Sequence, residues 1–437
     1  KFAEILKALK EMKEIIYKSI YPILLFAGFS ISLPPFFKSL SLFLLLLVLV
    51  INLFVNKNQT YFSKILNFKN PVLYLIGFYL LYCIGMFYST DLKEGFRDLI
   101  IKLPLILLPI AVCLLPKRII TKKRLWRLFL AFALGLIVMQ VYLLIMALSN
   151  AFSVEGFKVY KMLYVNLAQK YHPTYLSLFT SFAFLFSYFL PLKYIVKSTK
   201  KAFSLKLIFM LWLSFYNVLL SSRIGIIAMF LAFIVIIFNE IAIRKRFINT
   251  LAYFFVSLFF VFCSFAVNNI NKRFDDVVTN TQIEKNKDKK LNNGVSQRSF
   301  IYKNAGELIA KNLVFGAGTG DVKNVVQEFY LEKGVNFKTY LNPHNQFIQI
   351  AVAIGVVGLI FFILMLLLFS WSFWNKGGLI FLFSIGMLCV YMMTESIIER
   401  QQGVHFVAFY FMWLSAFKAI KKRGVKFTPL FLCFIEF

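Results

Sequence analysis

Apolar runs recur along the chain, and each is roughly 20 residues long, which is enough to cross a bilayer as a helix. Hydrophobic residues make up 60% of the sequence and charged residues only 16%, which is too little charge for a soluble domain of this length. The sequence therefore predicts an all-α protein, a polytopic transmembrane helical bundle.

The apolar runs predict about twelve spans. Before them, residues 1–14 predict a basic amphipathic segment that lies on the cytoplasmic surface. We divide the chain into N-terminal transmembrane helices (1–267), a large outer loop containing short helices (268–344), and C-terminal transmembrane helices with a cytoplasmic tail (345–437). The spans are expected at 15–33, 39–56, 72–88, 98–115, 128–148, 174–192, 205–221, 223–243, 247–267, 345–370, 378–396 and 403–418.

The formal net charge of +30 could suggest a nucleic-acid partner, but the distribution of the charge argues against one. When the loops are assigned alternately to two sides, most of the basic residues and few of the acidic ones fall on the side of the N-terminus. This is the positive-inside pattern, and it predicts that both termini are cytoplasmic. We therefore expect membrane lipids, and no nucleic acid, as partners of the basic loops.

With this topology, the residues able to carry chemistry gather at the outer face. Arg223 begins a helix directly after Ser221-Ser222, where a cation opposes the helix dipole and a bound anion would offset it. The alternatives are that Arg223 reaches the lipid headgroups or pairs with an acid such as Glu395. At the same face lie His172, Arg298, the glycine turn Gly316–Gly320, His344, His405 and the junction from Glu395 to Arg400.

Each of these residues also has an ordinary structural interpretation. His344 and His172 precede helices and could simply cap or begin them, and His405 lies inside a helix where a packed histidine is common. Glu395 and Glu399 are four residues apart, so we expect them to share a helix face, as an ion-pair cluster or a binding site. The glycine turn could bind an anion through backbone N–H groups or only turn the chain.

A metal site is not expected. The outer-face cluster lacks metal-ligand spacing, and it holds no Asp-x-Asp pair that would place a divalent ion on phosphate. The five cysteines all lie in apolar runs, which favours a packing role.

Four stretches resemble the O-antigen ligase and polymerase superfamily. Pro343–Phe347, continuing to Ala353–Gly358, resembles the His-Asn pair that follows the large periplasmic loop and enters a helix with a G-x-x-G step. Ser221–Gly225 resembles the short Ser-Arg-x-Gly junction of that family. Ser296–Arg298 followed by Phe315–Gly320 resembles its loop arginine and glycine turn, and Glu395–Gly403 resembles its acidic junction before the last helix.

The resemblance implies a multi-pass protein of the bacterial inner membrane whose active face is periplasmic. It implies a metal-independent glycosyltransferase that needs no cofactor and moves a glycan from undecaprenyl pyrophosphate to the lipid A–core oligosaccharide. It assigns catalysis to His344, Arg223 and Arg298. The residues expected to bind substrate are Arg223, Arg298, Asn345, His172, Gly318, Glu395 and Arg400.

Two other functions remain as alternatives. An O-antigen or exopolysaccharide polymerase of the same superfamily would use the same motifs, although the single long outer loop ending at His344 favours a ligase. A transporter of lipid-linked glycans belongs to a different class and predicts charged residues near mid-membrane. The nearly charge-free spans disfavour that class.

Overall fold

Helices joined by short connections make up most of the chain that the computed structural model describes. The described residues are 2–55, 72–116, 118–153, 156–191, 198–245, 247–266, 294–334, 342–374 and 379–421. A two-residue antiparallel ladder, β1 (Phe152–Ser153) with β2 (Gly156–Phe157), is the one sheet among them.

The helices of the first half follow one another with few long breaks. They are α1 (Phe2–Ser30), α2 (Pro35–Val55), α3 (Val72–Gly85), η2 (Met86–Tyr88), α4 (Leu92–Lys102), α5 (Pro104–Leu114), α6 (Lys122–Ala151), η3 (Val159–Met162), α7 (Val165–Ala168), α8 (Pro173–Phe189) and α9 (Thr199–Leu220). The second half contains α10 (Arg223–Phe238), η5 (Asn239–Arg244), α11 (Phe247–Ala266), α13 (Gly294–Ala310), α14 (Val322–Glu332), α15 (Gln346–Trp374), α16 (Leu379–Thr394), η6 (Ile397–Glu399) and α17 (Gln401–Lys421).

Six helices within the described residues are long and apolar enough to cross a membrane, so the twelve predicted spans are not confirmed. Two further apolar helices are shorter, at Val72–Tyr88 and Ile380–Thr394. Helix α8 has only 17 residues, and all of them are buried. The six helices lie at Pro35–Val55, Lys122–Ala151, Lys200–Leu220, Arg223–Ile241, Phe247–Ser264 and Gln346–Phe373.

Two predicted segments differ from the structure. The single span expected at 98–115 is two helices, α4 and α5, which meet at Leu103-Pro104. Proline has no N–H and fits the first turn of a new helix, so Pro104 starts α5 rather than continuing α4. The separate surface segment expected at residues 1–14 is instead the first part of the continuous helix α1.

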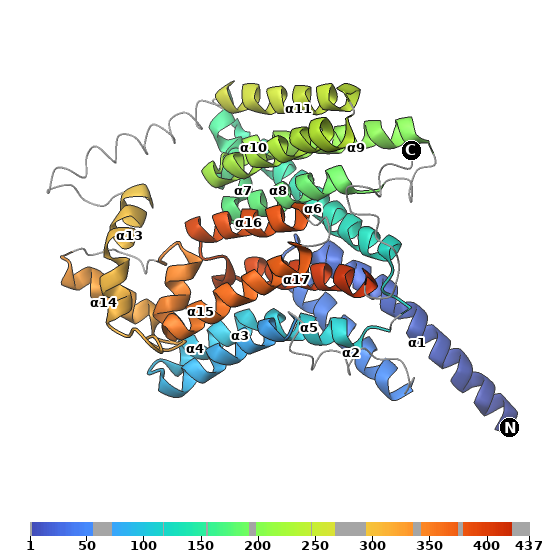
Figure 1. The fold of residues 1–437 in the computed structure, drawn as a ribbon, viewed down its shortest axis with the longest axis horizontal. Coiled ribbons are helices and arrows are strands. Elements are labelled where there is room, and N and C mark those ends of the chain that lie inside the picture. Colours follow the sequence, from blue (N-terminus) through green and yellow to red (C-terminus); the bar gives the residue numbers. More distant parts are fainter. Residues whose placement is uncertain are drawn as a thin grey trace.

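The helices run roughly side by side in three layers (Figure 1). Helices α9, α10 and α11 form one layer, α15, α16 and α17 the middle, and α2 to α5 the third. The short helices α13 and α14 lie together at one end of the bundle, beside the start of α15 (Figure 1). We call this end the His344 end.

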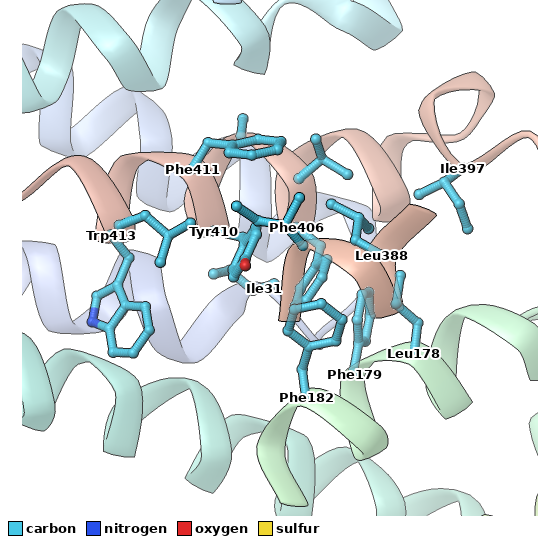
Figure 2. Close-up of a cluster of buried hydrophobic side chains, with 14 of the residues drawn as sticks. Ile31, Leu178, Phe179, Phe182, Leu388, Ile397, Phe406, Tyr410, Phe411 and Trp413 are labelled. Carbon is cyan, nitrogen blue, oxygen red and sulfur yellow. The ribbon is translucent and has the colours of Figure 1, made fainter. Parts of the chain in front are cut away.

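Aromatic side chains fill the centre of the bundle. Figure 2 shows Phe179 and Phe182 of α8 pointing toward Phe406 and Tyr410 of α17. The ring centroids of Phe179 and Phe406 are 4.9 Å apart, and those of Phe182 and Tyr410 are 5.1 Å apart. Aromatic pairs at such separations stabilise a core beyond the area that they bury. This packing fixes the start of α17, and with it the junction that carries Glu395 and Glu399.

Helix α15 is interrupted at Ile354-Gly355, where the backbone leaves the helical region and Gly355 has φ 71°. The chain after α13 fills the break: the N–H of Val356 donates to the carbonyl oxygen of Leu313 (2.9 Å), and that of Val357 to Val314 (3.3 Å). A Cβ on Gly355 would lie 2.0 Å from the Val314 carbonyl oxygen, so glycine is required for this approach. The segment after α13 is therefore joined directly to a membrane helix.

Candidate active site at the start of α15

The pair of His344 and Glu395 lies at the centre of the candidate site. His344 precedes α15 in a left-handed conformation (φ 50°), and its N–H donates to Asn342 Oδ1 (2.9 Å). Its Nδ1 lies 3.2 and 3.1 Å from the two carboxylate oxygens of Glu395, which is 2% exposed. A positive φ is strained for a residue with a Cβ, and such strain occurs often at functional sites.

The charge of Glu395 determines which nitrogen of His344 carries the proton. Burial raises the pKa of Glu395, but the hydrogen bond and charge of His344, with the charges of His172 and Arg298, bring its pKa below the ordinary value. An ionised carboxylate only accepts, so Nδ1 of His344 donates to Glu395. In a neutral imidazole this leaves Nε2 as a proton acceptor.

Arg298 reaches the same carboxylate from α13. Its Nη2 lies 3.7 Å from Glu395 Oε2, and its Nε is buried without a hydrogen-bond partner among the described residues. Tyr302, one turn later, places its hydroxyl 2.5 Å from the carbonyl oxygen of Met393 and 3.3 Å from that of His344. Sequence reasoning missed Tyr302, although its spacing from Arg298 puts both on one helix face.

His172 lies close enough to this cluster for the charges of the cluster to shift its pKa. Burial lowers the pKa of His172 to about 4, with Arg400, His344 and Arg298 also lowering it and Glu395 opposing them. Its Nδ1 is buried and has no hydrogen-bond partner among the described residues. The neighbouring Tyr175 donates to the carbonyl oxygen of Ser396 (3.1 Å), which ties α8 to the junction after α16. Arg400 is exposed at the end of η6.

Arg223 begins α10 directly after Ser222, and Ser221 before it ends α9 in a left-handed conformation (φ 46°). Two residues later, Gly225 packs so tightly that a Cβ would lie 1.7 Å from Ser177 Oγ. Asn217 Nδ2 donates to the Gly225 carbonyl oxygen (3.2 Å).

A buried polar network continues from there toward α16. The hydroxyl of Tyr391 lies 3.0 Å from both Ser177 Oγ and Ser181 Oγ. Tyr391 precedes Glu395 by one turn. These contacts place the start of α10, and therefore Arg223, at the His344 end.

The predicted binding residues Asn345 and Gly318 have structural partners. Asn345 Oδ1 accepts from the N–H groups of Phe347 (2.9 Å) and Ile348 (3.2 Å), which caps α15. The N–H of Gly318 donates to the Ala353 carbonyl oxygen (3.0 Å). Every N–H from Gly316 to Asp321 donates to an acceptor within the protein, so this turn has no donors left for an anion in this conformation.

Glu395 and Glu399 do not share a helix face, contrary to the expectation from their spacing. Helix α16 ends at Thr394, and η6 then turns Glu399 away from His344. Glu399 Oε2 accepts from Lys102 Nζ (3.0 Å), which also donates to Asp98 Oδ1 (2.5 Å). His405 makes its hydrogen bond elsewhere: its Nδ1 donates to the carbonyl oxygen of Gln401, one turn earlier in α17 (2.9 Å).

The fold and this cluster define a multi-pass helical membrane protein with a His–carboxylate–Arg site at one end of its bundle. Residues 208–363 match the family model described as O-antigen ligase. The matched stretch contains Arg223, Arg298 and His344, and it belongs to the O-antigen ligase superfamily, as its motifs predicted. Members of this family are glycosyltransferase-like enzymes. None of the curated proteins matches the chain.

Proposed function

We propose that the protein is an O-antigen ligase-like glycosyltransferase, which transfers a glycan from undecaprenyl pyrophosphate to the lipid A–core oligosaccharide. The hydrogen bond between Nδ1 of His344 and the buried Glu395 carboxylate carries the proposal. It orients the imidazole and leaves Nε2 directed away from the carboxylate, as a general base requires.

In the proposed reaction, Nε2 of His344 takes the proton of the acceptor hydroxyl. The hydroxyl oxygen then bonds to the anomeric carbon of the donor sugar as the bond from that carbon to the pyrophosphate oxygen breaks. The electron pair of the broken bond stays on the pyrophosphate. Glu395 stabilises the imidazolium that forms, since an anion in a buried position favours the protonated ring.

Arginine side chains meet the negative charge that develops on the leaving group. Arg298 has a buried Nε without a partner among the described residues, and its contact with Glu395 is long at 3.7 Å. Arg223 stands at the positive end of the α10 dipole, where an anion would be favourable. Guanidinium groups stay charged and bind phosphate oxygens in pairs, so both residues suit a pyrophosphate.

The proposal places the His344 end at the periplasmic face of the bacterial inner membrane. Apolar helices that surround the site would receive the polyprenyl chain, and both substrates would be held by the same membrane. Holding them side by side supplies the proximity that such a transfer needs. The reaction as proposed needs no metal ion.

An in vitro transfer assay tests this function. The purified protein in detergent receives undecaprenyl-pyrophosphate-linked glycan and lipid A–core, with EDTA and without nucleotide. We expect glycan on lipid A–core with the native protein and almost none with folded His344→Ala. Longer lipid-linked glycans without product on lipid A–core would instead identify a polymerase, and neither product would contradict glycan transfer altogether.

A further inference from the structure

A polar cavity lies next to the candidate active site. It has a volume of about 180 Å³ and is bounded by α3, α4, the glycine turn, α14, the start of α15 and η6. This volume is far larger than the roughly 15 Å³ that one buried water needs. The cavity could therefore hold a small organic group.

Three buried polar atoms around this cavity lack hydrogen-bond partners among the described residues. They are the hydroxyl of Tyr82 on α3, Oε1 of Gln349 on α15 and Oε1 of Glu399 on η6. Tyr82 is 1% exposed and Gln349 is 6% exposed. Buried polar groups cost free energy unless they are hydrogen-bonded, so these atoms indicate a ligand that supplies the missing partners.

The unpartnered atoms select the chemistry of that ligand. A carboxylate oxygen and an amide oxygen only accept hydrogen bonds, and a tyrosine hydroxyl both donates and accepts. The positive charge of Lys102 is already paired with Asp98 and Glu399. At the rim, Glu94 pairs with both Arg97 and Lys323. A cavity with free acceptors and paired cations disfavours phosphate and suits a neutral ligand that is rich in hydroxyl donors, which is a sugar.

The cavity and the catalytic pair lie on two sides of the same short stretch of chain. Asn342 and Pro343 line the cavity, and His344 follows them. Oδ1 of Asn342 accepts a hydrogen bond from the N–H of His344. It also accepts one from Oγ of Ser396 (2.5 Å), and Ser396 is the residue after Glu395. A sugar bound here would thus contact the segment that positions the proposed base.

We propose that this cavity binds a sugar residue of the acceptor glycan and so helps to place the acceptor hydroxyl near His344. This inference rests on the proposed transferase function and adds Tyr82, Gln349 and Glu399 as residues that recognise the acceptor.

Conservative substitutions of the unpartnered atoms test the site. Tyr82→Phe removes the hydroxyl, and Gln349→Met replaces the side-chain amide by a thioether, each with little change in side-chain volume. We expect each to raise KM for lipid A–core by about three- to tenfold, the value of one lost hydrogen bond. KM for the lipid-linked donor and kcat should stay the same, because neither residue contacts the proposed catalytic groups.

Tyr216→Phe is the matched control. Tyr216 is also fully buried, and its hydroxyl has no hydrogen-bond partner in the part of the chain that the structure describes, but it lies on α9 in a separate apolar cluster and does not line the cavity. We expect it to leave both KM values unchanged. Thermal unfolding of all three variants checks that each is folded.

Two kinetic results would overturn the assignment. If KM for lipid A–core is unchanged in both cavity variants, only water fills the cavity. If KM for the lipid-linked donor rises instead, the cavity does not bind the acceptor. If the native protein transfers no glycan at all, the proposed function fails, and a direct measurement still tests the cavity. Delipidated core oligosaccharide should then bind the native protein more tightly than Tyr82→Phe, as measured by calorimetry, and equal or absent binding would refute the sugar site.

Discussion

The His344–Glu395 pair and the Gly316–Asp321 turn lie at the same end of the bundle, and both were predicted from the sequence to meet substrate. They differ in how their hydrogen-bonding groups are used. In the turn, every N–H donates to an acceptor within the protein. Around Glu395, Arg298 Nε and His172 Nδ1 are buried without partners among the described residues. Unused hydrogen-bonding capacity therefore separates a site that can receive a ligand from a turn that holds the fold together.

The largest expected effect is on catalysis. His344→Ala should lower kcat of glycan transfer by about 10²–10⁴-fold, the usual contribution of a general base. The imidazole is 24% exposed, and its loss removes a hydrogen bond from the buried Glu395 carboxylate, so the melting temperature should also fall, and kcat is therefore compared per folded molecule. If His344→Ala transfers glycan at the native rate, His344 is not the catalytic base, and the His344–Glu395 pair is structural, like the turn.

A substitution in the Gly316–Asp321 turn should lower the stability of the protein and leave catalysis unchanged. A Cβ on Gly320 would lie 2.0 Å from the carbonyl oxygen of Asp91, so Gly320→Ala forces the backbone apart and should cost about 3 kcal/mol of stability. Thermal unfolding measures this loss. Because the turn borders the proposed acceptor cavity but not His344, kcat per folded molecule should be retained, and a stable variant with a low kcat would assign the turn to the chemistry instead.

Acidification should lower the free energy of unfolding of the protein, because His172 is buried beside the His344–Glu395 pair. The pKa of His172 is about 4 in the folded protein and 6.5 in the unfolded chain, so the unfolded state binds the proton first. Stability is then complete above pH 6.5 and falls as the pH decreases toward 4, by on the order of 3 kcal/mol. The lowered pKa of Glu395 adds a further loss only below its ordinary value of 4.5.

Melting temperatures at a series of pH values between 7 and 4 measure this effect, with the native protein and His172→Gln compared side by side. The variant should lose most of the pH dependence in this window. Identical curves for the two proteins would show that His172 titrates normally and is not buried against the cluster.

The smallest expected effect comes from a glycine outside the turn. Gly306 lies inside α13, and a Cβ there would have no atom within 4 Å. Gly306→Ala should therefore stabilise the protein by about 0.5–1 kcal/mol through its helix propensity, without changing transfer. A loss of stability at Gly306 would contradict the idea that tight packing, rather than glycine itself, distinguishes the turn.

The sequence predicted the helical membrane class, because long apolar runs are a local property that needs no tertiary information. It also predicted the family, because His344, Arg223 and Arg298 stand in short recognisable motifs. The number of spans was harder to predict. Pro104 divides one apolar stretch into two helices, and α8 is buried throughout although it is short, so hydropathy alone does not separate a span from a core helix.

The contacts of the site depended on tertiary structure. Glu395 was a candidate, but its hydrogen bond to His344 joins residues 51 positions apart, which no local pattern contains. Spacing wrongly grouped Glu395 with Glu399, because the end of α16 between them breaks the helical period. Lys102 was missed as the partner of Glu399, since a lysine in an apolar stretch does not indicate which acid it will meet.

The interruption of α15 determines which parts of the site can move independently. Hydrogen bonds from Val356 and Val357 to Leu313 and Val314 would have to break before the end of α13 could leave α15, and in apolar surroundings such bonds are costly to lose. The opposite end of α13 carries Arg298 and is held by the buried Ile301, by the hydroxyl of Tyr302 on the carbonyl oxygen of Met393, and by one long ion pair. A rotation of α13 about the bonded segment near Leu313 would therefore change the distance from Arg298 to Glu395.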